Sequence, residues 1–100
     1  MKLIRNKIPD LISDKSKITQ IETDKDFLEA LGMKICEEGL ELKYAISSKD
    51  ADSILEEAGD CFEVLMTVIG ELDLTLKDLQ EQADVKADEL GSFSQGYQLN

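Results

Sequence analysis

Apolar residues recur every three or four positions through most of the chain that follows Thr23. This spacing predicts two long amphipathic helices, over residues 26–47 and 51–72, with Thr23 or Asp24 as the N-cap of the first. The apolar stripe of the first predicted helix is Leu28, Leu31, Ile35, Leu42 and Ile46, and that of the second is Ile54, Ala58, Cys61, Leu65, Val68, Ile69 and Leu72.

A third helix is predicted between Thr75 and Gly91. Thr75 and Asp78 have the spacing of a capping box, and Gly91 suits the left-handed conformation that ends many helices. Pro9 suits the first turn of a short N-terminal helix. The remaining segments are predicted to be a loop at residues 15–17, a short extended piece at 18–22 and an irregular or short-strand tail at 92–100.

The second half of the second predicted helix is apolar nearly all round, over residues 64–69. Such a segment has to be covered on more than one side, and a chain of 100 residues with three helices can hardly supply that cover alone. We therefore expect a single all-α domain spanning residues 1–100. It would be a helical bundle of three main helices plus a short N-terminal helix, with a four-helix-type core completed in a homodimer or a higher homo-oligomer.

The composition excludes several classes of partner. With 22 acidic residues against 11 basic ones, the formal net charge is −11, which argues against nucleic acid because Lys and Arg dominate phosphate binding. No apolar run approaches the roughly 20 residues of a membrane span, and the N-terminus lacks a signal-peptide core, so we expect a cytoplasmic protein that binds no membrane. Cys36 and Cys61 lie in apolar-periodic segments, and we expect both to be reduced core thiols.

Two acidic motifs stand within the two long predicted helices. They read Glu37-Glu38-x-x-Glu41 and Glu56-Glu57-x-x-Asp60. Residues three apart on a helix share a face, so each motif can offer two carboxylates to one point in space. Four converging carboxylates repel one another strongly, and the ordinary remedy is a bound divalent metal.

Helical geometry separates these acids. Glu38 lies about 50° from the centre of its apolar stripe, Glu41 about 110° and Glu37 about 150°. On the second helix Glu57 lies about 90° away and Asp60 about 150° or more. Glu37 is therefore predicted to point to solvent, and Asp60 to join the others only if the first helix or a second subunit covers its side. A merely solvated acidic face is the alternative interpretation.

Three stretches together resemble the all-alpha nucleoside triphosphate pyrophosphohydrolase superfamily, the MazG-like group, and within it small phosphoribosyl-ATP pyrophosphohydrolase-like proteins. They are Lys2-Leu3-Ile4-Arg5-Asn6-Lys7-Ile8-Pro9, the two acidic motifs, and Lys86-Ala87-Asp88-Glu89-Leu90-Gly91-Ser92-Phe93. The resemblance covers almost the whole chain. It implies hydrolysis of a nucleotide between the α- and β-phosphates, with Mg²⁺, or alternatively Mn²⁺, as the cofactor.

The resemblance also implies roles for the acids. The metal ligands would be Glu38, Glu41, Glu57 and Asp60, with Glu37 and Glu56 as water-orienting or supporting acids. An acid that the metal does not fully engage can accept the proton of the attacking water, and Glu38 and Glu41 are the two catalytic candidates.

Four basic residues are candidates for contacts at this site. The resemblance favours Arg5 and Lys7 as contacts to substrate phosphates, although both also fit a solvated N-terminal segment. Lys86 is either a phosphate contact or a cation that stabilises a helix C-terminus. Lys34, one turn before Glu38, is expected to form an i,i+4 ion pair.

Leu90 stands where members of the family often have an arginine, and the chain has few bases. These two features favour an alternative function, a catalytically weak or inactive regulatory module that binds a nucleotide or metal. A structural helical dimer with solvated acids is the third interpretation. The spacing of the motifs does not distinguish a nucleotide substrate from a phosphoribosyl-nucleotide.

Overall fold

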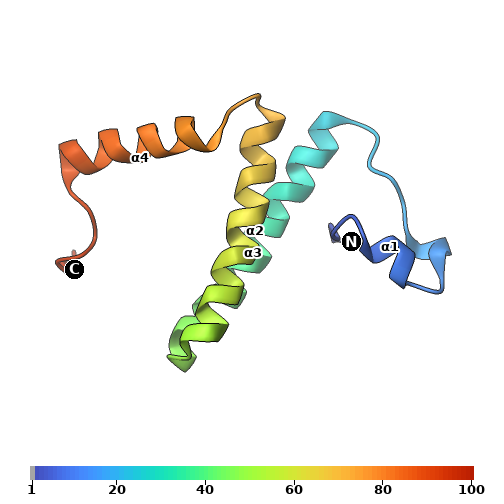
Figure 1. Ribbon diagram of the computed structural model, residues 1–100, viewed down its shortest axis with the longest axis horizontal. Helices are drawn as coiled ribbons and strands as arrows, with labels where there is room; N and C mark the ends of the chain where they lie inside the picture. Colours follow the sequence, from blue (N-terminus) through green and yellow to red (C-terminus); the bar gives the residue numbers. More distant parts are fainter. Residues whose placement is uncertain (1) are drawn as a thin grey trace.

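The computed structural model describes residues 2–100, and within this range the chain is all-helical and has no β-strand (Figure 1). The predicted all-α class, with three main helices and a short N-terminal one, is confirmed. Its elements are α1 (Ile8–Leu11), the single 3₁₀ turn η1 (Lys15–Lys17), α2 (Asp24–Ser48), α3 (Ala51–Glu71) and α4 (Leu76–Leu90). The predicted loop at residues 15–17 is wrong in detail, because the Asp14 side chain accepts a hydrogen bond from the Ser16 N–H and closes the turn.

Local hydrogen bonds begin each main helix where the sequence predicts. The Thr23 hydroxyl accepts from the N–H of Asp26 at 3.1 Å, and Asp50 caps α3 by accepting from Asp52. At the start of α4, Thr75 and Asp78 form the complete capping box. The predicted helix ends are confirmed to within two residues.

α2 and α3 form an antiparallel hairpin that contains the core (Figure 1). The buried positions of α2 are Leu31, Glu38 and Ala45, seven residues apart, which is the spacing of a coiled-coil seam. Val64 and Ile69 are buried from α3. An acidic residue therefore occupies the middle of the seam of α2.

For three residues the prediction of a core position is wrong. Ile46 and Leu72 are 56% and 54% exposed, because Ile46 lies one residue, or about 100°, from the seam position Ala45, and Leu72 follows the last residue of α3. Cys36 is also exposed, since it lies about 200° from Glu38 around α2, whereas Cys61 is half-buried. Both cysteines are free thiols.

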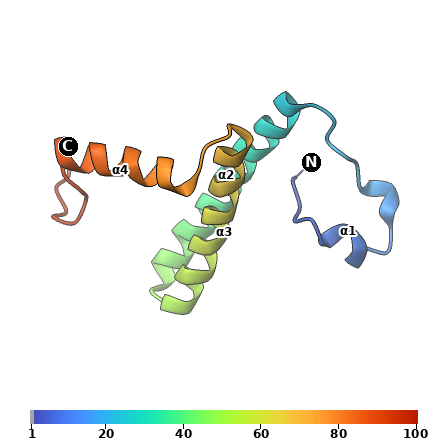
Figure 2. The same ribbon diagram turned by 45° about the horizontal axis from the view of Figure 1, so that its top comes forward.

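α4 extends away from the hairpin in both views (Figures 1 and 2). Only its first turns approach the end of α3, around a small cavity lined by Ile69, Leu74, Asp78, Leu79 and Gln82. No residue of α4 is buried, and Leu76 and Leu90 are 49% and 78% exposed. The third main helix therefore leaves most of its own apolar side uncovered.

No helix within residues 2–100 combines the length and the apolar character needed to cross a lipid bilayer.

Candidate metal centre

The two acidic motifs meet in the middle of the α2–α3 hairpin. One carboxylate oxygen from each of four residues, two per helix, lies within 4.8 Å of the other three. The four residues are Glu38 and Glu41 on α2 and Glu57 and Asp60 on α3, which we call the four-acid cluster. The turn at Lys49 and Asp50 makes the helices antiparallel, so that each motif faces the other. The predicted convergence of these four side chains is confirmed.

The four acids differ in burial. Glu38 is only 7% exposed, Glu57 and Asp60 are half-buried, and Glu41 is exposed. The Oε2 atoms of Glu38 and Glu57 are buried and accept no hydrogen bond from any group in residues 2–100. Since a buried carboxylate oxygen without a partner is unfavourable, these two atoms favour a proton or a cation in the cluster.

The same crowding raises the pKa of two carboxyl groups. Burial raises the pKa of Glu38 most, and the charge of Glu41 adds to the effect, whereas Lys34 opposes it. Burial also raises the pKa of Glu57, and the proximity of Glu41 and Asp60 raises it further. Glu38 and Glu57 therefore hold protons more tightly than isolated glutamates do.

The environment of the neighbouring Cys61 thiol disfavours its thiolate form. Burial raises its pKa, and the negative charges of Glu38 and Asp60 raise it further. Because the thiolate is the reactive form, the cluster suppresses the reactivity of Cys61.

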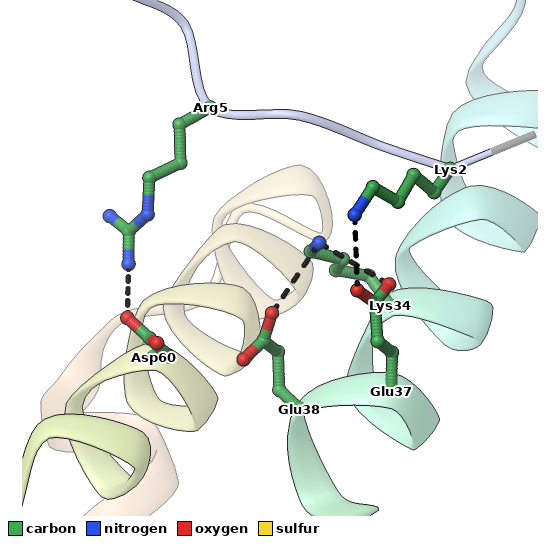
Figure 3. A network of polar contacts seen from close by, with 6 residues as sticks. All are labelled: Lys2, Arg5, Lys34, Glu37, Glu38 and Asp60. Carbon is green, nitrogen blue, oxygen red and sulfur yellow. Dashed lines mark hydrogen bonds and ion pairs between the residues drawn. The ribbon is translucent and has the colours of Figure 1, made fainter. Parts of the chain in front are cut away.

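Lys34 provides a positive charge next to the buried acid. Its Nζ lies 3.4 Å from Oε1 of Glu38, which confirms the predicted i,i+4 pair, and 3.3 Å from Oε2 of Glu37. The prediction that Glu37 points to solvent is wrong. Its side chain is 32% exposed, because the N-terminal segment passes over it and places Lys2 Nζ 3.7 Å from its Oε1 (Figure 3).

Arg5 reaches the cluster from the same N-terminal segment. Its Nη2 donates to Oδ1 of Asp60 at 2.6 Å, across the hairpin from the Lys2 pair (Figure 3). The sequence predicts that Asp60 joins the other acids only if the first helix or a second subunit covers its side of α3. In the structure α2 packs against that side within one chain, and Arg5 of the N-terminal segment covers the Asp60 carboxylate.

The other predicted phosphate contacts are not brought to the cluster. Lys7 is exposed at the N-cap position of α1. Lys86 is exposed on α4, which leads away from the hairpin (Figure 2). Neither lysine forms an ion pair within residues 2–100. Of the three candidates, only Arg5 lies at the cluster in a single chain.

A shallow cleft of about 370 Å³ adjoins the cluster on the side of the α2–α3 turn. It is lined by Glu41, Tyr44, Ala45, Ser48, Ser53 and Glu57, so two of its lining residues belong to the four-acid cluster. Tyr44 is 63% exposed there. Sequence reasoning missed this residue, although its position three residues after Glu41 places it on the same side of α2.

Oxygen ligands from carboxylates are what hard divalent cations prefer, and the donor set of the cluster consists of carboxylates alone. Together with the two unpartnered oxygens, this chemistry fits a metal ion bound between α2 and α3. The cluster can thus bind a metal, while the family resemblance stays a prediction. No protein-family model, curated protein or solved structure matches this chain.

Proposed function

We propose that this protein is a Mg²⁺-dependent nucleotide pyrophosphohydrolase that cleaves between the α- and β-phosphates, releasing a nucleoside monophosphate and pyrophosphate. The observation that supports this most is the convergence of the four acids around two buried, unpartnered oxygens. The reaction itself is inferred from the sequence motifs of the pyrophosphohydrolase superfamily. Mn²⁺ offers the same preference for oxygen ligands and is the alternative metal.

In this proposal the four acids hold the cation. When bound, Mg²⁺ offsets the charge of the phosphates and lowers the pKa of a bound water. Glu38 is buried and paired with Lys34, so we assign it to metal binding rather than proton transfer. Glu41 is the exposed acid and borders the cleft, and it is our candidate for accepting the proton of the attacking water.

The cleft beside the cluster is where we place the nucleoside. Phosphates at the four acids would leave the sugar and base next to Tyr44, whose exposed ring offers a stacking surface. The hydroxyls of Ser48 and Ser53 already donate hydrogen bonds, to the carbonyl of Ala45 and the carboxylate of Asp50. Base selection in this cleft would therefore depend on shape and stacking.

We further propose that the protein functions as a homo-oligomer, a homodimer or larger. Its solvent-accessible surface is 8750 Å², whereas a compact monomer of 11.2 kDa has about 5,700 Å². Its radius of gyration is 16.7 Å, against about 13 Å for a compact domain of this length. The excess of roughly 3,000 Å² exceeds the approximately 800 Å² that each partner buries in a standard interface. A second copy supplies apolar cover for α4 and the outer face of the hairpin.

The test measures whether the protein hydrolyses nucleotides and which phosphoanhydride bond it cleaves. Canonical and modified nucleoside triphosphates and phosphoribosyl-nucleotides would be incubated with the protein and Mg²⁺ in ¹⁸O-labelled water. We expect monophosphate and pyrophosphate as products, with the label in only one of them. Glu57→Gln should abolish the release, whereas Glu29→Gln, which removes an exposed acid on the side of α2 opposite Glu38, should retain it.

The regulatory module is the second candidate, and it is favoured because Lys86 belongs to α4, which extends away from the hairpin (Figure 2). It predicts Mg²⁺-dependent binding of a nucleotide without product release, lost in Glu38→Gln and Asp60→Asn. A purely structural dimer predicts that neither Mg²⁺ nor a nucleotide binds, and that those two variants are equally or more stable. Product release from any member of the panel contradicts both alternatives.

A further inference from the structure

We propose that Arg5 pairs with Asp60 while the cluster holds no metal, and that a divalent metal ion displaces the Arg5 side chain from Asp60. The displaced guanidinium group then binds the phosphates that the metal holds. The displacement concerns the cluster alone. The transfer to phosphate rests on the proposed function. The N-terminal segment would thus change its contacts when the metal binds.

The ion pair between Arg5 and Asp60 is the basis of this inference. Its N–O distance of 2.6 Å is the shortest among the ion pairs within residues 2–100. Asp60 is also a member of the four-acid cluster. The guanidinium group therefore sits on a carboxylate that the geometry offers to a metal.

The cluster is incompletely neutralised even with Arg5 in place. Glu38 is more than nine-tenths buried, and its Oε2 has no partner within residues 2–100. Arg5 neutralises only Asp60, because its side chain is 61% exposed and contacts Asp60 from above the hairpin (Figure 3). A divalent ion between the helices would satisfy the inner oxygens that Arg5 does not reach.

Arg5 is held in a way that permits release. The single hydrogen bond of its side chain within the described chain is the one to Asp60, and the backbone around it forms no regular helix or strand. Lys2, in contrast, holds the segment through Glu37, outside the cluster. Exposed ion pairs of this kind contribute little, so a cation that binds four carboxylates can displace Arg5.

Displacement leaves the guanidinium beside the metal without a carboxylate. A positive charge is repelled by the bound cation but attracted by phosphate oxygens, with which a guanidinium can form two parallel hydrogen bonds. The same residue would therefore oppose the binding of metal alone and favour the binding of metal with a polyphosphate. These opposite effects on the two binding affinities distinguish displacement of Arg5 by the metal from a structural role in which Arg5 stays on Asp60.

Titration calorimetry of the full chain with Mg²⁺, and then with inorganic pyrophosphate at saturating Mg²⁺, tests both halves without any turnover. Arg5→Gln should bind Mg²⁺ alone about two- to fivefold more tightly, as expected for loss of an exposed competing ion pair. It should bind pyrophosphate about tenfold more weakly, as expected for loss of a charge-assisted contact. The matched control Lys2→Gln removes the same charge from the same segment and should change Mg²⁺ affinity less than twofold.

Backbone ¹⁵N relaxation provides a readout of the segment itself. Saturating Mg²⁺ should lower the order parameters of residues 3–7 of the wild-type chain, while it slows amide exchange in the middle of α2 and α3. In Asp60→Asn, the order parameters of residues 3–7 should already be low and should not respond to Mg²⁺. This variant loses the pair at an exposed site, so the fold of the hairpin is expected to persist.

Three results would overturn the proposal. Unchanged or weaker Mg²⁺ binding by Arg5→Gln contradicts displacement and makes Arg5 a permanent support of Asp60. Unchanged or higher order parameters of residues 3–7 with Mg²⁺ contradict release. Pyrophosphate binding that does not depend on Arg5 contradicts the transfer to phosphate. Absence of nucleotide hydrolysis, with the calorimetric and relaxation results as expected, would count against the proposed function and leave the displacement of Arg5 standing.

Discussion

Lys34 and Glu38 lie one helical turn apart on α2, with Nζ of the lysine 3.4 Å from Oε1 of the glutamate. The pair neutralises one oxygen of the most buried acid in the cluster and leaves Oε2 without a partner. Glu38 is thus stabilised enough to be tolerated in the seam of the hairpin, while it retains an oxygen available to a cation.

Replacing Glu38 tests whether this burial is unfavourable without metal. Glu38→Gln should raise the free energy of unfolding by about 1 kcal/mol in a chelator, because it removes a buried negative charge near three other acids. The same variant should lose most of the stabilisation that Mg²⁺ confers on the wild-type chain. Urea unfolding with and without Mg²⁺ measures both effects. Glu29→Gln, at an exposed acid on the side of α2 opposite Glu38, is the control, and an equal gain in stability there would point to net charge rather than to the cluster.

The raised pKa values of Glu38 and Glu57 predict how stability depends on pH. A carboxyl group with a raised pKa in the folded state adds stability that is fully present below its unfolded pKa of about 4.3 and is lost as the pH rises through the folded pKa. The metal-free protein should therefore become more stable as the pH falls through the raised folded pKa values of these two groups toward their unfolded pKa of about 4.3. Thermal unfolding in a chelator measures this, and Glu38→Gln should have a shallower dependence.

Saturating Mg²⁺ should reverse that trend. Protons compete with the cation for the same oxygens, so the Tm of the metal-loaded protein should fall as the pH is lowered through the same range. A slope of the same sign with and without Mg²⁺ would mean that the metal does not bind the acids whose pKa is raised.

The exposed apolar side of α4 predicts self-association. Sedimentation equilibrium should give a mass of at least two chains, and Leu90→Glu should weaken association at least tenfold, because it places a charge on a residue that is 78% exposed in the single chain. Val85→Glu adds the same charge about 140° around α4 from Leu90, at a residue that is 51% exposed, and should leave association nearly unchanged. A monomer at micromolar concentration would contradict the proposed assembly.

The position of Tyr44 in the cleft predicts a role in binding rather than in chemistry. Tyr44→Ala should raise KM for a nucleotide about tenfold, the effect of losing one stacking contact worth about 1.4 kcal/mol, and should change kcat less than threefold. Tyr97→Ala, in the exposed tail, is the matched control. A large loss of kcat with unchanged KM would place Tyr44 in the reaction rather than in recognition of the base.

The sequence alone predicted the helices and much of the cluster, because both depend on short-range geometry. Caps at Thr23 and Thr75 act over three residues, and the i,i+3 spacing in each acidic motif places two carboxylates on one side of a helix. The pair between Lys34 and Glu38 follows from the same helical turn. These features need no knowledge of how the helices pack.

Packing decided which of these residues meet. The seam through Leu31, Glu38 and Ala45, rather than one that includes Ile46, follows from how α2 lies against α3. That register is also what brings Asp60 to Glu38 within one chain. Periodicity specifies a face only to within about one residue, or 100° of a turn, and the contacts of the partner helix select the side that is buried.

The sequence by itself thus determined the helices, their caps and the side of each helix that presents its acids. Only the tertiary structure decided that Arg5 contacts Asp60, which lies 55 positions away in the chain, that Glu37 is partly covered, and that α4 lies apart from the hairpin. Helix periodicity and capping are local, with a range of a few residues, whereas contacts between distant segments depend on the relative placement of whole elements.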